Sequence, residues 1–200
     1  MVWGQPFLAA TRAPSGATVL DTIAGLPIHP LIVHATVVVV PAAALSVALA
    51  AVWPRFRRWA GFLPLALAVA AVVLAPLSTS SGESLEARVG ESGLVERHSE
   101  LGEGLLVWVV VLAVAAVALQ VRDRLAARRS PSAVDVRGTP ARVRSTPRSA
   151  GVLVTAVVTL LLVVAGVAGT LVQTVLIGHS GARAAWGDVA APSGGGDDDD

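Results

Sequence analysis

Four long apolar runs dominate the pattern of hydrophobic and polar positions along the chain. Each run approaches the roughly 20 residues that an α-helix needs to cross the hydrocarbon core of a bilayer. We therefore predict four membrane-spanning helices, over about residues 30–53, 60–77, 92–121 and 150–177. The expected fold is an all-α membrane protein, built as a bundle of four transmembrane helices.

The polar segment between the second and third apolar runs contains two helix signals. Ser80 and Glu83 have the spacing of a capping box, which predicts a short extracytoplasmic helix between transmembrane helices 2 and 3. Further along, a stripe of residues recurs at helical spacing: Leu94, His98, Leu101 and Leu105. The stripe indicates that helix 3 begins before the bilayer, near Ser92, and directs His98 toward the bundle.

Small residues predict how helix 4 packs and where it ends. Ala165 and Gly169 have the small-xxx-small spacing that permits close contact between membrane helices. Gly178 follows the last apolar residues and has the position of a C′ glycine. We therefore expect helix 4 to end just before Gly178, with His179 in the loop beyond it.

The transmembrane domain is expected to cover residues 28–187. Before it, residues 1–27 are predicted to be an extracytoplasmic N-terminal segment. Within it, residues 122–149 form an Arg-rich cytoplasmic linker between helices 3 and 4. After it, residues 188–200 end in glycines and aspartates, which predicts a disordered acidic tail.

The composition supports an integral membrane protein and removes several kinds of chemistry. Hydrophobic residues make up 54% of the chain and charged residues 14%, with a mean hydropathy of +0.70. The chain has no cysteine, so it cannot form disulfides, thiolate metal sites or a catalytic thiol. Cysteine ligation of an iron–sulfur cluster and thioether attachment of a c-type haem are excluded for the same reason.

The charges are distributed unequally between the two ends of the predicted bundle. The 1–2 and 3–4 connections hold eleven Arg and two acidic residues, net +9, whereas the termini and the 2–3 connection hold four Arg and twelve acidic residues, net −8. Arginine is retained on the cytoplasmic side. We therefore predict a multi-pass protein of the inner (cytoplasmic) membrane with both termini extracytoplasmic. This topology already explains the basic linker, so no nucleic-acid partner is expected.

All four histidines lie where an apolar run meets a polar segment, and the predicted topology puts all of them at the outer face. His29 and His34 start helix 1, His98 starts helix 3 and His179 follows helix 4. Five residues of helix turn by about 500°, so His29 and His34 diverge by roughly 140°. We expect His34 to point inward, because a buried imidazole needs a partner and its apolar neighbours supply none.

Neutral imidazoles bind haem iron, copper and zinc, and four-helix bundles hold such ligands on facing helices. The predicted cofactor-binding residues are His34, His98, His179 and His29. The cofactor is haem b in one interpretation. In another it is copper or zinc held by His34, His98 and His179, and in a third there is none.

Three segments together resemble one family of predicted bacterial membrane proteins: Ile28-His29-Pro30-Leu31-Ile32-Val33-His34, His98 before Leu101-Gly102, and Gly178-His179-Ser180-Gly181. They resemble domain-of-unknown-function family twenty-two thirty-one (DUF2231), over about residues 26–187. The resemblance implies a four-helix bundle with histidines near one face. Some members are joined to Rieske-type iron–sulfur domains, which implies redox partners.

Two functions stay open from the sequence. In the first, a histidine cluster at the outer face binds haem b or a metal ion for membrane-associated electron transfer, with a redox partner protein at that face. In the second, the chain is a non-catalytic membrane subunit or scaffold and its histidines are structural. No catalytic residue is predicted, so an enzyme acting on its own is not indicated, and the oligomeric state is left open.

Overall fold

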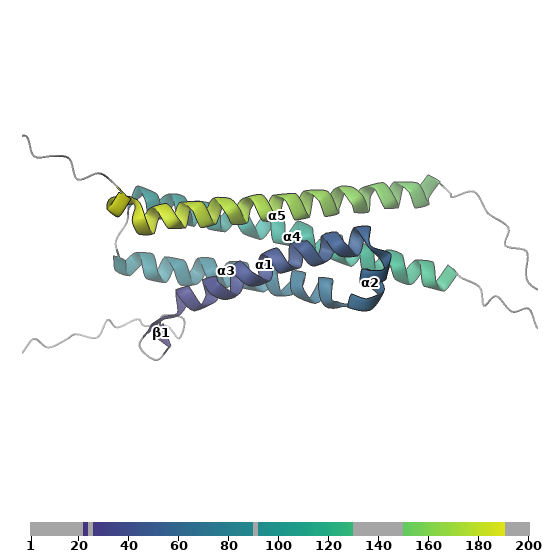
Figure 1. Ribbon diagram of the computed structural model, residues 1–200, viewed down its shortest axis with the longest axis horizontal. Helices are drawn as coiled ribbons and strands as arrows, with labels where there is room; N and C mark the ends of the chain where they lie inside the picture. The colour runs from purple at the N-terminus through teal and green to yellow at the C-terminus, as the bar shows by residue number, and fades with distance from the viewer. Residues whose placement is uncertain (1–21, 24–25, 90–91, 130–149, 191–200) are drawn as a thin grey trace, which may run out of the picture.

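The computed structural model describes residues 22–23, 26–89, 92–129 and 150–190. Those residues are almost entirely helical. A two-residue antiparallel ladder joins β1 (Thr22–Ile23) to β2 (Leu26–Pro27) just before the first helix. The helices are α1 (Ile28–Val52), α2 (Pro54–Ala60), α3 (Leu63–Val89), α4 (Gly93–Arg129) and α5 (Ala150–Ala190) (Figure 1).

Four of these helices, α1, α3, α4 and α5, are long and apolar enough to cross a membrane. The predicted four-helix membrane fold is therefore confirmed. Helix α1 packs against α3 and α4 packs against α5, so the bundle consists of two antiparallel hairpins (Figure 1). Contacts of α3 with α4 and of α1 with α5 join the hairpins. One end of the bundle, the α3–α4 end, holds the starts of α1 and α4 and the ends of α3 and α5.

The centre of the bundle is built largely from small side chains. Its fully buried apolar residues are Ala43, Ala44, Val47, Ala68, Ala71, Val109, Leu112 and Ala115. Alanine lets helix backbones approach closely, and close packing drives helix association where lipid is as apolar as the side chains. Large apolar side chains such as Val38, Leu161 and Val175 are exposed instead, as expected of a surface that faces acyl chains.

Glycines bring α4 and α5 into close contact. A Cβ atom on Gly166 would lie 2.9 Å from the backbone of Leu112, and one on Gly169 would overlap the Trp108 ring. Gly169 therefore lies in the helix contact, as predicted, but Ala165 is exposed. The prediction of Ala165 was wrong because the rotation of α5 about its own axis, which spacing does not reveal, turns Gly166 toward α4.

The helix ends differ from the sequence prediction. Helix α3 continues without a break to Val89, so the predicted separate short helix after residue 77 is the last part of α3. The serines there donate to carbonyls of their own helix, as in Ser84 Oγ to Ser80 O at 3.3 Å, rather than capping a new one. Helix α4 continues into the predicted Arg-rich linker as far as Arg129.

Helix α5 also passes its predicted end and runs through Gly178 to Ala190. A C′ glycine needs a positive φ, and among the described glycines only Gly61 has one. The remaining parts of the N-terminal segment, the Arg-rich linker and the acidic tail lie outside the described residues.

The turn between α1 and α3 is ordered by polar contacts with α4. The sequence indicated only a short loop here, but residues Pro54–Ala60 form helix α2, with proline at its first position. Arg57 pairs with Asp123 (Nε to Oδ2, 2.8 Å) and donates from Nη1 to the Ala50 carbonyl at 2.9 Å. Gln120 Nε2 donates to the Gly61 carbonyl at 2.6 Å. The contact with Ala50 ties α2 to α1, and the contacts with Asp123 and Gln120 hold the first hairpin against α4 at the end opposite the α3–α4 end.

Candidate cofactor site at the α3–α4 end

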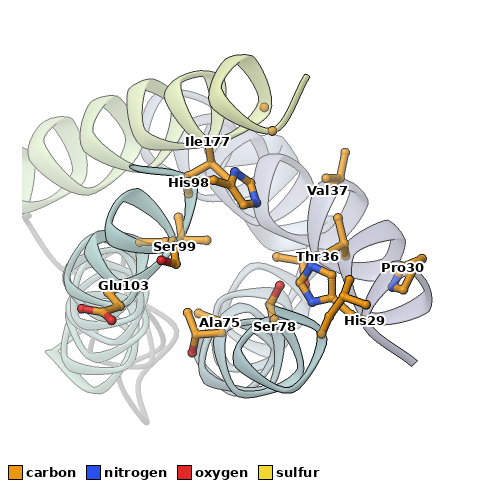
Figure 2. Close-up of a pocket in the computed structure, with 18 of the residues that line it drawn as sticks. His29, Pro30, Thr36, Val37, Ala75, Ser78, His98, Ser99, Glu103 and Ile177 are labelled. Carbon is orange, nitrogen blue, oxygen red and sulfur yellow. The ribbon is translucent and has the colours of Figure 1, made fainter. Parts of the chain in front are cut away.

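A cavity of about 540 Å³ lies between the four long helices at the α3–α4 end. This volume is in the range of small-molecule and cofactor sites. Its wall is mainly apolar, and its polar groups include His29 and Thr36 of α1, Ser78 of α3, and His98 and Glu103 of α4 (Figure 2). Each of the four helices contributes, so the cavity exists only when both hairpins are assembled.

His29 reaches the cavity from the first turn of α1. Its Nδ1 lies 3.0 Å from Ser81 Oγ on α3, and Ser81 is almost fully buried. The Ser81 hydroxyl also lies 3.0 Å from the Ser78 carbonyl of its own helix, to which it donates. The next residue, Gly82, passes so close that a Cβ atom there would be 3.1 Å from His29 Cε1.

His98 enters the cavity from the second turn of α4, and its partners on the neighbouring helix are again a serine and the glycine that follows it. Its Nδ1 lies 3.0 Å from Ser180 Oγ on α5, and that hydroxyl donates to the Ile177 carbonyl at 2.9 Å. A Cβ atom on Gly181 would be 3.0 Å from His98 Cε1. The His29 and His98 rings face the same space between the helices (Figure 2). Each ring has Nδ1 engaged, so Nε2 is the nitrogen left for a ligand.

His34 lines the cavity but stays exposed, and its Nδ1 contacts the Pro30 carbonyl of its own helix at 2.5 Å. The prediction that His34 rather than His29 is the inward residue was therefore wrong. Helix α1 buries Thr36 against its neighbours. His29 precedes Thr36 by seven residues, close to two full turns, and so shares its face, whereas His34 precedes it by two residues and lies on the opposite side.

His179 is exposed and does not line the cavity. The segment that contains it nevertheless reaches the site, because Ser180 and Gly181 contact His98. Of the four predicted residues, the structure thus brings together His29 and His98, keeps His34 beside them and leaves His179 outside. The sequence reasoning missed Ser81-Gly82 and Ser180-Gly181 as contacts of the rings. A Ser-Gly pair near the end of the second helix of each hairpin was the signal that could have found them.

The predicted three-histidine metal set is not assembled. Within the described ranges, no group of three or more His, Asp or Glu side chains is arranged to hold a metal ion. His34, His98 and His179 do not converge, because His34 is exposed and contacts its own helix, and His179 is exposed outside the cavity.

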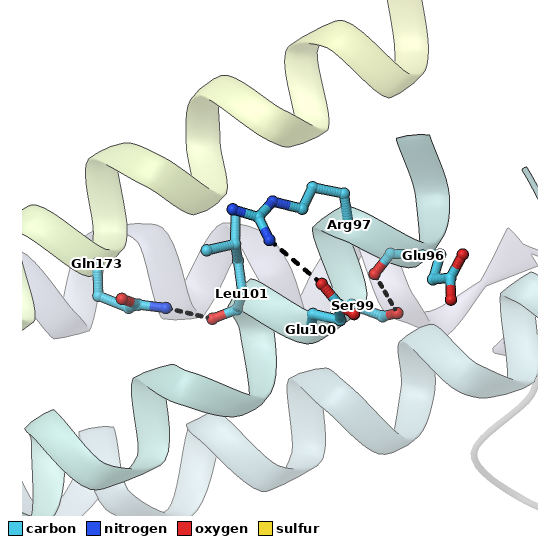
Figure 3. A network of polar contacts seen from close by, with 6 residues as sticks. All are labelled: Glu96, Arg97, Ser99, Glu100, Leu101 and Gln173. Atoms are coloured by element: carbon cyan, nitrogen blue, oxygen red, sulfur yellow. Dashed lines mark hydrogen bonds and ion pairs between the residues drawn. The ribbon is translucent and has the colours of Figure 1, made fainter. Parts of the chain in front are cut away.

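A polar contact beside the cavity holds α5 against α4 at the level of His98. Gln173 Nε2 donates to the Leu101 carbonyl at 2.6 Å, and a Cβ atom on Gly104 would be 2.8 Å from the same nitrogen (Figure 3). The neighbouring pair of Arg97 with Glu100, at 3.4 Å, is exposed on both sides and contributes little to stability. The half-buried amide contact of Gln173 is the one that positions the helices.

A family model described as "Predicted membrane protein (DUF2231)" matches residues 25–192. The chain belongs to this family. The match spans all four membrane helices of this DUF2231 protein, together with the cavity and every histidine. No curated protein and no solved structure matches the chain. The family description establishes a predicted membrane protein and assigns no chemistry, so the function has to be argued from the cavity.

Proposed function

We propose that this DUF2231 protein binds haem b in the cavity, where His29 and His98 would hold its iron, and serves membrane-associated electron transfer. The observation that carries the proposal is the matched pair of imidazoles. They come from different hairpins, each is held through Nδ1 by a serine, and each keeps Nε2 for a ligand. Haem iron takes one or two ligands from the protein.

The number of converging ligands favours haem over a bare metal ion. Zinc sites in proteins use three or four protein ligands. The cavity offers His29 and His98 from facing helices, and a porphyrin would complete the coordination of its iron itself. The mainly apolar wall suits the body of such a cofactor. When bound, haem would supply one-electron transfer, while the residues of this chain bind and orient it.

The charge pattern supports a location in the inner membrane with the cavity facing outward. Described acidic residues gather at the α3–α4 end, including Glu83, Glu96 and Glu103, and described arginines gather at the α2 end, including Arg58 and Arg124. Because arginine is retained on the cytoplasmic side, the α3–α4 end faces outward. A redox partner protein would then meet the acidic outer surface beside the cavity.

Absorption spectra of the purified full-length protein, after addition of haem, test the proposal. We expect a Soret band and the sharp reduced bands of six-coordinate, two-imidazole haem. His29→Ala or His98→Ala should lose this spectrum, while His179→Ala, the control outside the cavity, should keep it. Protein that stays colourless after haem addition, or a His29 or His98 variant that keeps the spectrum, would overturn the assignment. Stoichiometric copper or zinc in elemental analysis would replace haem with a metal ion. Protein that binds neither haem nor a metal ion would favour the scaffold function.

A further inference from the structure

The two hairpins repeat one arrangement around the cavity. In each, a histidine near the start of the first helix contacts a Ser-Gly pair near the end of the second helix. His29 of α1 meets Ser81-Gly82 of α3, and His98 of α4 meets Ser180-Gly181 of α5. The Nδ1 to Oγ distance is 3.0 Å in both. The site therefore has two equivalent halves that face each other (Figure 2).

The proton on each serine decides which nitrogen of the ring is protonated. A hydroxyl has one proton. Here the hydroxyl oxygen lies 3.0 Å (Ser81) or 2.9 Å (Ser180) from the carbonyl oxygen three residues earlier in the same helix. With its proton donated there, the hydroxyl presents only lone pairs to the ring. The Nδ1 of His29 and of His98 must then carry the proton and donate it to the serine. In a neutral ring, Nε2 is left as a bare lone pair.

The glycine after each serine sets the position of the ring. Cε1 lies between the two ring nitrogens, and it is the ring atom nearest to where a Cβ would stand, at 3.1 Å for Gly82 and 3.0 Å for Gly181. Any side chain would push the imidazole away from the helix. Glycine lets the ring lie against the helix while Nδ1 reaches the serine.

We infer that Ser81-Gly82 and Ser180-Gly181 are matched positioning elements, which hold His29 and His98 in the Nδ1–H tautomer with Nε2 directed into the cavity. The identity of the ligand rests on the proposed function, but the tautomer is a property of the protein alone. Such outer partners orient a ligating imidazole and raise its basicity, and losing one costs about 10- to 100-fold in affinity.

Nitrogen NMR of the haem-free, full-length protein tests the inference directly. His34→Asn and His179→Asn leave two imidazoles, which are labelled with ¹⁵N and recorded at a pH where both are neutral. We expect both rings to carry the proton on Nδ1. Ser81→Ala should release His29 alone toward a tautomer mixture, and Ser180→Ala should release His98 alone. Ser84→Ala is the control, because that hydroxyl donates to its own helix and contacts no imidazole.

Rings protonated mainly on Nε2, or rings unchanged by both serine variants, would overturn the inference. The tautomer is measured first in protein that keeps both serines, so the inference is still tested if a serine variant fails to fold. Haem titration provides the second measurement: Ser81→Ala and Ser180→Ala should weaken binding by about 10- to 100-fold, with recovery in Ser→Thr. Nδ1–H rings in a protein that never binds haem would refute the proposed function and leave this inference standing. Nε2–H rings in a protein that binds haem would refute this inference and leave the proposed function standing.

Discussion

His29 and His34 are five residues apart, and over that interval an α-helix turns by about 500°, so the two rings cannot share a face. Each finds a different partner for Nδ1. His29 contacts a buried hydroxyl on another helix, and His34 contacts a carbonyl of its own helix. A partner within the helix leaves His34 independent of the bundle. The position of the His29 ring therefore depends on correct packing of α1 against α3, whereas the position of the His34 ring does not.

Gly181→Ala should disturb the site without disturbing the helix. Alanine is the better helix former, but its Cβ would stand 3.0 Å from His98 Cε1 and push the ring toward the cavity. We expect haem affinity to fall by about tenfold, at the lower end of outer-partner effects. Haem titration with a parallel thermal unfolding curve measures both quantities.

Gly151→Ala in the same helix is the matched control for that substitution, since a Cβ there meets nothing within 4 Å and the residue does not line the cavity. It should keep the haem affinity of the original protein. Equal affinities for the Gly181 and Gly151 variants would show that the close approach of Gly181 to the ring has no role.

At the scale of the elements, the contact of α4 with α5 depends on glycines rather than on large interlocking side chains. The atoms nearest to a Cβ on Gly166 belong to the Leu112 backbone, at 2.9 Å. A backbone cannot change rotamer to make room, so a methyl group there must separate the helices. Because His98 and Ser180 belong to these two helices, their separation would also open the site.

We expect Gly166→Ala to lower the free energy of unfolding by about 1–3 kcal/mol, the usual cost of overpacking. Gly178→Ala in the same helix should not lower it, since a Cβ there meets open space. Thermal unfolding in detergent micelles compares the two. A Gly166 variant as stable as the original protein would contradict the close helix contact.

At the scale of the whole molecule, the two ends of the bundle carry opposite charge. The sequence places net +9 with the 1–2 and 3–4 connections and net −8 with the termini and the 2–3 connection. In the structure, the acidic 2–3 connection lies at the same end as the cavity (Figure 1). The orientation of the bundle therefore also decides on which side of the membrane the cavity lies.

Cysteine labelling in intact cells settles that orientation, because the chain has no cysteine of its own. Ala185→Cys lies exposed near the end of α5, and Ala127→Cys lies exposed near the end of α4, at opposite ends of the bundle. We expect a membrane-impermeant maleimide to label position 185 only. Both positions should react once the membrane is opened, and labelling of position 127 alone in intact cells would reverse the topology.

The sequence by itself determined the number of membrane spans. It also determined that the helix ends which carry the histidines lie at the same end of the bundle. Apolar length and charge act along the chain, and alternate spans must run in opposite directions, so these features need no knowledge of packing. The ends of α3 and α5 were missed because residues outside the apolar window stay helical when they pack on a neighbour, as Ser81 and Ser180 do against the two rings.

Only the tertiary structure decided which imidazoles face the cavity. The choice of His29 over His34, of Gly166 over Ala165, and of Ser180 over its neighbour His179 depends on how far each helix is rotated about its axis. That rotation is set by many small contacts with other helices, separated from these residues by 50 or more positions, as in the pairing of His29 with Ser81 at a separation of 52 residues. Spacing within one helix carries no record of it.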